Sequence, residues 1–138
     1  MKTIVKNRRA RYDYHMEDKF VGGIVLAGSE VKSIRNGSIS INESYIQMKS
    51  GELFLINTHI AQYGSNSHEP TRDRKILITK KEIGRLDVAV RQKRYTLIPT
   101  AVCEINGRFK IEFCLAKGKN TVDKRETIKQ REWERKGI

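Results

Sequence analysis

The order of apolar and polar residues along the chain predicts two β-hairpins. The first covers residues 45–56, where a two-residue turn would set Lys49 opposite Glu52 and pair apolar residues with one another. The second covers residues 101–115 around Asn106-Gly107, a dipeptide that strongly favours such a turn. Apolar and charged residues alternate along its last strand, so we expect one buried side and one basic, solvated side. The buried side would consist of Phe109, Ile111, Phe113 and Leu115.

Glycine and proline mark two stretches in which a strand is predicted to bend. Residues 12–26 are rich in Val, Ile, Tyr and Phe, and Gly22-Gly23 inside them predicts a bulge of the kind that small barrels need. Pro99 falls inside the apolar run 95–102, which predicts an edge or a bulge, because proline cannot donate a ladder hydrogen bond. The pattern therefore indicates a strongly curved β structure.

Two short helices are predicted between the strands. The first begins near Ser29 and ends at Asn36-Gly37, a pair that favours the left-handed conformation at a helix end. The second runs over about residues 80–91, because Thr79 and Glu82 have the spacing of a capping box. Many short strands with few helical turns are typical of a mainly β fold.

Charge narrows the class of partner. The 138 residues include 28 Lys and Arg against 16 Asp and Glu, a formal net charge of +12. Such an excess favours a polyanionic partner, with nucleic acid first and an anionic membrane surface second. No apolar run approaches the ~18 residues of a membrane-spanning helix, and the charges near the N-terminus do not suit a signal peptide, so we expect a cytoplasmic protein. Cys103 and Cys114 are then expected to be reduced thiols in or near the core.

Basic residues gather in an N-terminal arm over residues 2–11, around both ends of the second predicted helix and after the last strand. Tyr12, Tyr14 and Tyr63 are either stacking partners for unpaired bases or core residues. A β-rich body with such a surface is typical of an oligonucleotide-binding (OB) barrel, which grips nucleic acid with strand faces and loops. We therefore expect a mainly β fold, a small OB-type β-barrel with two or three short helices, over residues 1–116.

The composition changes after Ala116. In residues 117–138 the sizeable apolar residues are spaced too widely for a helical core stripe; they are Val122, Ile128, Trp133 and Ile138. We expect this basic C-terminal tail to be disordered when free and to fold on a charged partner. The chain thus divides into a β-rich body over residues 1–116 and a basic tail over residues 117–138.

The residues offer little enzyme chemistry. None of His15, His59 and His68 stands at a metal-ligand spacing from another His or a Cys. No Walker-type loop, nucleophile elbow or suitably placed pair of carboxylates is present. A ribonuclease that uses His59 or His68 is an open alternative to the simpler interpretation of these residues as loop and strand-end histidines. We predict no enzyme, no metal and no cofactor.

Six motifs, taken in order, resemble those of one bacterial family. They are Asn7-Arg-Arg-Ala-Arg11, Gly28-Ser-Glu-Val-Lys-Ser-Ile-Arg35, Ser44-Tyr45, Pro70-Thr-Arg-Asp-Arg-Lys-Ile-Leu77, Ala116-Lys-Gly-Lys119 and Asp123-Lys-Arg-Glu-Thr-Ile-Lys-Gln-Arg-Glu-Trp133. The family is that of the SsrA-binding proteins, also called small protein B. The ordered set is highly specific, although any one motif alone would be weak.

The resemblance implies a non-catalytic adaptor in trans-translation, the rescue of ribosomes stalled on messages without a stop codon. In the family, an OB-type barrel holds the tRNA-like domain of transfer-messenger RNA (tmRNA). The C-terminal tail probes the decoding centre and the empty mRNA channel of the small ribosomal subunit. The implied partners are therefore tmRNA and the ribosome, with no membrane, and we expect a monomer when the protein is free.

The same resemblance assigns residues to each partner. The RNA-binding residues would be Asn7, Arg8, Arg9, Arg11, Arg35, Arg72, Arg74, Lys75, Leu77, Lys117 and Lys119. The ribosome-binding tail would contribute Asp123, Lys124, Arg125, Ile128, Lys129, Arg131 and Trp133.

Three features depart from the family pattern. Val21 stands where members often have Glu, Val122 stands where some have His, and the chain stops at Ile138 where other members continue. Two other classes are open on the residues alone. A ribosomal structural protein or cold-shock-like binder would explain the charge and the barrel but not the tail with its tryptophan. The histidine-dependent ribonuclease is the other.

Overall fold

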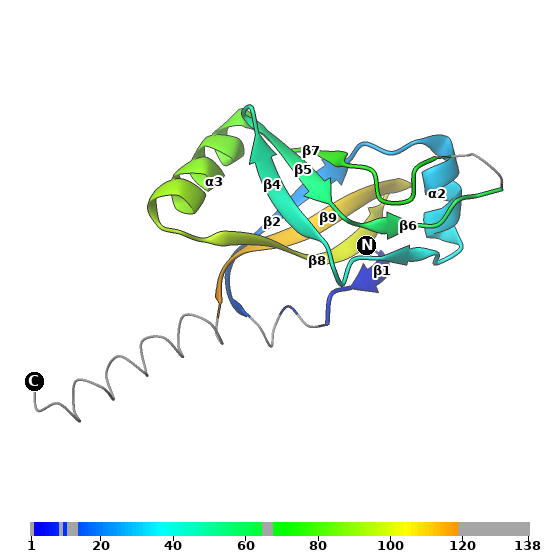
Figure 1. Ribbon diagram of the computed structural model, residues 1–138, viewed down its shortest axis with the longest axis horizontal. Helices are drawn as coiled ribbons and strands as arrows, with labels where there is room; N and C mark the ends of the chain where they lie inside the picture. The colour runs from blue at the N-terminus through cyan, green and yellow to red at the C-terminus, as the bar shows by residue number, and fades with distance from the viewer. Residues whose placement is uncertain (1, 9, 11–13, 65–67, 119–138) are drawn as a thin grey trace, which may run out of the picture.

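Seven antiparallel strands form one strongly curved sheet, shown in Figure 1. The computed structural model describes residues 2–8, 10, 14–64 and 68–118. The strands follow the spatial order β1-β8-β9-β2-β7-β5-β4. They are β1 (Lys2–Lys6), β2 (Tyr14–Ile24), β4 (Tyr45–Lys49), β5 (Glu52–Ile56), β7 (Arg74–Leu77), β8 (Thr96–Ile105) and β9 (Arg108–Gly118). A separate short pair joins β3 (Ile39–Ser40) to β6 (His59–Ile60).

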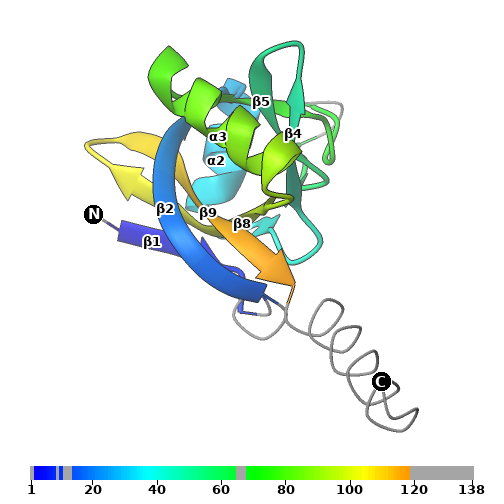
Figure 2. The same ribbon diagram turned by 90° about the vertical axis from the view of Figure 1, so that its left-hand side faces the viewer.

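The prediction of a mainly β fold with short helices is confirmed. The sheet is open, because β1 and β4 are its edge strands, yet it curls far enough for β4 to lie close to β8. The two described helices are α2 (Gly28–Arg35) and α3 (Lys80–Gln92). They lie at opposite ends of the curled sheet, as Figures 1 and 2 show.

Both predicted hairpins form in the predicted register. In β4 and β5 Lys49 pairs with Glu52, as the alternation of residues required. In β8 and β9 the turn residues Asn106 and Gly107 have φ values of 50° and 77°. Two successive positive φ values produce the turn twist that matches two antiparallel strands, and Asn-Gly is the pair that adopts them most readily.

The long strand β2 bends at a different place from the one predicted. Its pairing with β9 shifts between Met16 and Lys19, so the bulge contains Glu17 and Asp18 rather than Gly22-Gly23. Gly22 is needed for packing instead, because a Cβ atom there would lie 2.6 Å from Cγ2 of Ile76 on β7. The absence of a side chain therefore allows β7 to pack closely against β2.

The two bulge residues reach towards the α3 end of the molecule. The carboxylate of Glu17 accepts a 2.6 Å hydrogen bond from the hydroxyl of Tyr95, which raises the pKa of that phenol. The carboxylate of Asp18 accepts a 2.8 Å hydrogen bond from Arg85 on α3. The bulge thus turns two acidic side chains towards α3 and the start of β8.

The helix ends and the proline obey the local rules on which their predictions rest. Thr79 and Glu82 form the predicted capping box at the start of α3. The chain leaves α2 through Asn36 and Gly37, and Gly37 has a φ of 75°. Pro99 lies beside a bulge, since the register of β8 with β9 shifts between Pro99 and Ala101.

The core fills the inside of the curled sheet. Phe20 of β2 and Phe113 of β9 stack there with ring centroids 5.7 Å apart. Leu86 of α3 and Ile34 of α2 seal it from opposite ends and are almost completely buried. Phe109, Ile111, Phe113 and Leu115 are all buried, as predicted. Cys103 and Cys114 are buried free thiols, also as predicted.

Candidate nucleic-acid interface

Strand pairing places two rows of residues on the outer face of the sheet, which we define as the face opposite the core. The first row, across β1, β8, β9 and β2, is Lys6, Ala101, Glu112 and Val21. The second row, which continues onto β7, is Thr3, Cys103, Lys110, Gly23 and Leu77. Residues at the alternate positions, such as Val102, Ile111 and Ile76, are buried in the core. The rows therefore define one continuous surface.

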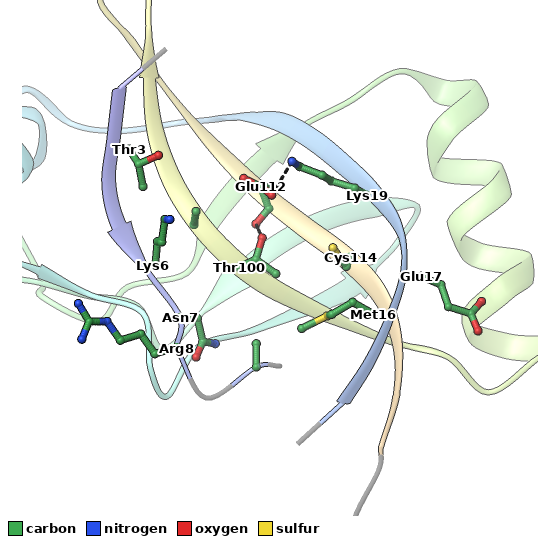
Figure 3. Close-up of a pocket in the computed structure, with 12 residues that line it drawn as sticks. Thr3, Lys6, Asn7, Arg8, Met16, Glu17, Lys19, Thr100, Glu112 and Cys114 are labelled. Carbon is green, nitrogen blue, oxygen red and sulfur yellow. Dashed lines mark hydrogen bonds and ion pairs between the residues drawn. The ribbon is translucent and has the colours of Figure 1, made fainter. Parts of the chain in front are cut away.

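The Asn7 hollow lies at one end of this surface and has a volume of about 580 Å³. Figure 3 shows β1 and the segment after it on one side, β2 on the other, and β8 and β9 between them. Ala101 and Cys114 contribute to its apolar lining, together with Ala10 and Met16. Three cationic side chains line it as well: Lys6, Arg8 and Lys19.

The three cations of the Asn7 hollow are not equivalent. Lys19 forms a 2.9 Å ion pair with Glu112, and this hydrogen bond, together with the negative charge, raises the pKa of the lysine. Lys6 and Arg8 are exposed and have no ion pair with any residue that the structure describes. The second acid lining the hollow, Glu17, is hydrogen-bonded to Tyr95. Three cations against the two acids Glu17 and Glu112 leave the lining with a net charge of +1, which attracts phosphate groups.

Asn7 is fixed in the wall of this hollow by two hydrogen bonds. Its backbone amide donates to the carbonyl oxygen of Thr100 at 2.8 Å, and its Nδ2 donates to the carbonyl oxygen of Pro99 at 3.1 Å. Its Oδ1 is buried and has no hydrogen-bond partner among the residues that the structure describes. The amide orientation is set because an oxygen in place of Nδ2 would face the Pro99 carbonyl oxygen without a hydrogen atom between them.

The Leu77 hollow lies towards the other end of the outer face, where β7 pairs with β2, and has a volume of about 340 Å³. Leu77 is 53% exposed, which is unusually open for a leucine whose neighbour Ile76 is buried in the core. Gly23 leaves room beside it, and Arg108 and Lys110 of β9 supply positive charge. An apolar surface with cations beside it suits a ribose or base whose phosphate binds the cations.

The structure corrects the prediction that Arg74 faces RNA. Its side chain is fully buried, and its Nε donates to Oε2 of Glu30 at 2.7 Å. The rest of the guanidinium donates to the carbonyl oxygens of Thr58, Arg72 and Pro70. Every donor group of Arg74 is therefore engaged inside the protein, and none is available to a phosphate.

Glu30 is the centre of this buried cluster. Burial alone would raise the pKa of its carboxyl group, but hydrogen bonds from Arg72, the Ala27 amide and Arg74 outweigh that effect and lower the pKa below its ordinary value. Arg72 is only half-buried, yet its guanidinium also donates to Glu30 and to the carbonyl oxygen of Val25. The basic run 72–75 thus contributes mainly to structure, by tying β7 to the start of α2.

The other predicted RNA-binding residues that the structure describes lie in separate places. Lys75 is half-buried and pairs with Glu52 at 3.2 Å. Arg35, at the end of α2, is exposed and lies 3.9 Å from Glu104. Lys117 is exposed at the end of β9, with its Nζ 4.8 Å from the ring centroid of Tyr95. Of the predicted set, the structure brings Asn7, Arg8 and Leu77 to the hollows of the outer face.

Some predictions fall on residues outside the described ranges. These are the RNA-binding residues Arg9, Arg11 and Lys119 and the tail residues Asp123, Lys124, Arg125, Ile128, Lys129, Arg131 and Trp133. β9 runs to Gly118, which pairs with Tyr14, so this strand extends two residues beyond the predicted boundary at residue 116.

Four cations of the two hollows were not predicted as site residues. They are Lys6, Lys19, Arg108 and Lys110. The alternation of residues along β9 placed Arg108 and Lys110 on the solvated side of the strand, and this pattern could have identified them as candidate RNA-binding residues. Lys6 and Lys19 come together only through the pairing of β1 with β8 and of β2 with β9, which no local pattern specifies.

Within the described ranges no three His, Cys, Asp or Glu residues gather closely enough to hold a metal ion. Neither α2 nor α3 is long and apolar enough to cross a membrane. His59 is exposed on β6, whereas the ring of His68 lies 2.8 Å from Ser29 Oγ and 2.9 Å from the Ile60 carbonyl oxygen. These contacts suit a histidine that fastens a loop.

A curled β sheet with a basic outer face and two cation-lined hollows defines the class of small β-rich RNA-binding proteins. Comparison with known proteins identifies the family. The model of the SmpB protein family matches residues 4–137, and the chain therefore belongs to the SmpB family.

Individual relatives agree with this assignment. The SsrA-binding protein of Acholeplasma laidlawii is 49% identical over 138 residues, covering 98% of this chain and 93% of that protein. The SsrA-binding protein of Thermobifida fusca is 46% identical, covering 97% and 86%. A solved structure described as "tmRNA-SmpB: a journey to the center of the bacterial ribosome" is 40% identical, with a TM-score of 0.69 and 85% of each chain covered.

Proposed function

We propose that this protein is a non-catalytic RNA-binding adaptor that binds the tRNA-like domain of tmRNA and delivers it to stalled ribosomes in trans-translation. Membership of the SmpB family supports this function, and the solved relative is described with both tmRNA and the bacterial ribosome. The single structural observation that carries the proposal is the outer face of the sheet. It presents uncompensated cations and two hollows on one continuous surface.

The outer face is the surface that receives the tRNA-like domain. Lys6 and Arg8 at the Asn7 hollow, and Arg108 and Lys110 at the Leu77 hollow, contact phosphates and set the orientation of the RNA. The apolar linings of the hollows receive sugars or bases exposed by the folded RNA, as is usual where proteins recognise non-helical RNA. Leu77 is the apolar contact at its end of the face.

The residues beyond the body serve the ribosome. The tail over residues 117–138 enters the decoding centre and the empty mRNA channel, where its Lys and Arg residues meet ribosomal RNA. Its composition supports coupled folding and binding, because it carries many charges and few apolar residues. Lys117 and Lys119 begin this segment, and Trp133 is its largest apolar side chain.

The remaining roles follow from this function. The adaptor works as a monomer in the cytoplasm, where bacterial ribosomes translate, and it uses neither a cofactor nor a metal ion. It catalyses no reaction, so binding and positioning account for its whole effect. Arg9 and Arg11 extend the basic surface of the arm, and Arg35 adds charge at the end of α2.

A binding assay with a matched control tests the proposal. The isolated tRNA-like domain of tmRNA should bind the wild-type protein with strong dependence on salt concentration, and Leu77→Asp should weaken that binding at least tenfold. Val88→Asp is the control, because Val88 is an exposed apolar residue of α3, away from the outer face. Equal effects of the two substitutions, or no preference for this RNA over an unrelated hairpin, would contradict the assignment.

A further inference from the structure

We propose that Tyr95 is a positioning residue: it contacts β2 and β9 at once and fixes the place where the chain leaves the sheet after Gly118. The inference rests on the proposed function in one respect, that the residues beyond this point serve the ribosome. Three observations carry it: the short end of the β2–β9 ladder, the two contacts of the Tyr95 side chain, and the fixed backbone of Tyr95 itself. Figure 2 shows the ends of β2 and β9 side by side at one end of the sheet.

The end of the β2–β9 ladder is weakly held by backbone pairing. The register shifts between Met16 and Lys19, and three residue pairs follow between this bulge and the end of β9. β8 begins at Thr96, opposite Ala116, so the last two residues of β9 pair with β2 alone among the described strands. A short two-stranded ribbon is only marginally stable by itself, and ladder ends open readily. Side-chain contacts are therefore needed to keep this end on the body.

The side chain of Tyr95 supplies such a contact to each strand. Its hydroxyl donates to Oε2 of Glu17 in the β2 bulge at 2.6 Å, a short distance that is typical of a hydrogen bond to a charged acceptor. The Nζ of Lys117 on β9 lies 4.8 Å from the ring centroid, close enough for the cation to be attracted to the ring. Figure 3 shows Glu17 pointing away from the Asn7 hollow and towards α3, the helix that precedes Tyr95. One side chain thus joins both strands of the ladder end to the body.

Tyr95 is itself held in a fixed position. Its backbone amide donates to the carbonyl oxygen of Ala89 on α3 at 3.2 Å. Arg94, which precedes it, has a φ of 57°, the left-handed conformation that commonly ends a helix, and Thr96, which follows it, begins β8. Tyr95 is also partly buried against the core. The two contacts of its side chain therefore start from a well-anchored part of the body.

The two contacts of Tyr95 are not equally important for β9. The β2 bulge has a second anchor, because Asp18 accepts a 2.8 Å hydrogen bond from Arg85 on α3. Loss of the Tyr95 hydroxyl therefore leaves the bulge attached to α3. The contact of the ring with Lys117 is the one that reaches β9. We therefore expect the ring of Tyr95, more than its hydroxyl, to determine where the following chain begins.

The first experiment uses the free 138-residue protein and needs neither RNA nor ribosomes. Backbone order parameters of His15 and Lys117, from ¹⁵N relaxation, should be near the rigid value of about 0.85 in the wild type and fall below about 0.6 in Tyr95→Leu. The Hε signals of Lys117 should move downfield in Tyr95→Leu, because the ring current is lost, and stay in place in Tyr95→Phe. Low order parameters in the wild type, or unchanged ones in Tyr95→Leu, would overturn the inference.

The matched control for this measurement is Tyr63→Leu. The ring of Tyr63 lies 5.3 Å from Nζ of Lys32 on α2, so this tyrosine makes the same kind of contact with a lysine elsewhere in the molecule. Tyr63→Leu should leave the order parameters of His15 and Lys117 unchanged. An equal fall in both variants would show a general loss of rigidity and would overturn the inference.

Two substitutions of Lys117 test the contact from the other side. Lys117→Met removes the cation and keeps Tyr95, and it should fold normally because Lys117 is exposed. Its order parameters at His15 and at position 117 should fall as in Tyr95→Leu. Lys117→Arg should keep them high, since a guanidinium group also binds the face of an aromatic ring. Rigid strands in Lys117→Met would overturn the inference even if Tyr95→Leu were unfolded.

The second experiment measures ribosome rescue by peptide tagging on a message without a stop codon. Tyr95→Leu should lower rescue at least fivefold and keep the affinity for the isolated tRNA-like domain within twofold, whereas Tyr95→Phe should keep rescue within twofold. Tyr95→Leu combined with Lys117→Met should lose no more than the larger single loss, because both remove the same contact. Additive losses, or normal rescue despite low order parameters, would overturn the inference. Absence of rescue by the wild type, together with the expected order parameters, would contradict only the proposed function.

Discussion

Arg74 and Glu30 form an ion pair in which both side chains are fully buried, and the pair joins β7 to the first turn of α2. Two charges removed from water are stable together only if their hydrogen bonds are satisfied. Here Arg74 also donates to the carbonyl oxygens of Thr58, Arg72 and Pro70. The cluster therefore holds the chain segment that precedes β7 in place.

Replacement of Arg74 should destabilise the protein. Arg74→Met removes one of the two arginine partners of Glu30 and leaves three carbonyl oxygens without the guanidinium donors, namely those of Thr58, Arg72 and Pro70. We expect a loss of about 3–5 kcal/mol in the free energy of unfolding, measured with urea. Lys75→Met is the matched control, since Lys75 and its partner Glu52 are both only half-buried, and it should cost less than about 1 kcal/mol. A large loss of RNA affinity with unchanged stability in Arg74→Met would show that the arginine binds RNA.

Glu30 should make the free energy of unfolding depend on pH in the acidic range. Its pKa is lowered in the folded state, so the unfolded chain takes up the proton first as the pH falls. The stabilisation is complete above the ordinary value of 4.5 and is lost as the pH drops through the lower folded value. Urea unfolding between pH 3 and 6 should show this slope in the wild type. In Glu30→Gln the slope should be shallower; an unchanged slope would assign the acid sensitivity to other carboxylates.

Two adjacent glycines should respond differently to the same substitution. In Gly22→Ala the new Cβ would lie 2.6 Å from Ile76 Cγ2, so we expect a loss of about 1–3 kcal/mol in stability. In Gly23→Ala the nearest atom is Leu77 Cβ at 3.6 Å, an ordinary contact, and the cost should be below about 0.5 kcal/mol. Thermal unfolding of the two variants compares them directly. Equal losses would contradict the close packing of β7 on β2.

Removal of the Lys6 and Arg8 side chains at the Asn7 hollow should change the salt dependence of RNA binding. Lys6→Ala with Arg8→Ala should weaken binding, and the slope of log K against log salt should fall by up to about one unit for each lost phosphate contact. Arg91→Ala is the control, because Arg91 lies on α3 in an ion pair with Asp87. Equal changes of the slope in both variants would show that the RNA does not bind the Asn7 hollow in preference to α3.

The tail should be separable from the body. Truncation after Gly118 retains all of β9, so the melting temperature should be unchanged. The affinity for the isolated tRNA-like domain should stay within about twofold of the wild type. Ribosome rescue, measured by peptide tagging on a message without a stop codon, should be lost. Trp133→Ala should lower rescue in the full chain without affecting RNA binding, because a stacked aromatic contributes about 1–3 kcal/mol. A drop of several degrees in melting temperature would instead make Trp133 part of the core.

Local chemistry explains which parts of the fold were predictable from the sequence. Asn106-Gly107 and the Thr79–Glu82 capping box act over a few residues, so the sequence contains all the information they need. The bulge at Glu17 and Asp18 depends on Arg85 and Tyr95, which come from distant parts of the chain. Gly22-Gly23 is a stronger local signal for a bend than Glu17-Asp18. Gly22 is instead needed for the close contact of β2 with β7.

The candidate site likewise has features that the sequence could predict and features that depend on tertiary contacts. Arg74 lies in a basic run that is typical of an RNA-binding surface, and its burial depends on Glu30, 44 positions earlier in the chain. Lys19 belongs to the Asn7 hollow only because β2 pairs with β9. Leu77 came from a family motif, and its exposure supports a contact role. Patterns of residue type thus predicted a basic surface, while tertiary pairing decides which charges it presents.

The last strand, β9, sets a distance between the two hollows of the outer face and the end of the sheet. β9 begins at Arg108 in the Leu77 hollow, passes the Asn7 hollow at Glu112 and Cys114, and ends at Gly118. Eleven residues of strand span roughly 30 Å. Because β2 pairs along it as far as Tyr14, this length cannot stretch when the molecule is loaded. The length of β9 therefore fixes the distance between the RNA bound on the sheet and the point at which the C-terminal residues begin.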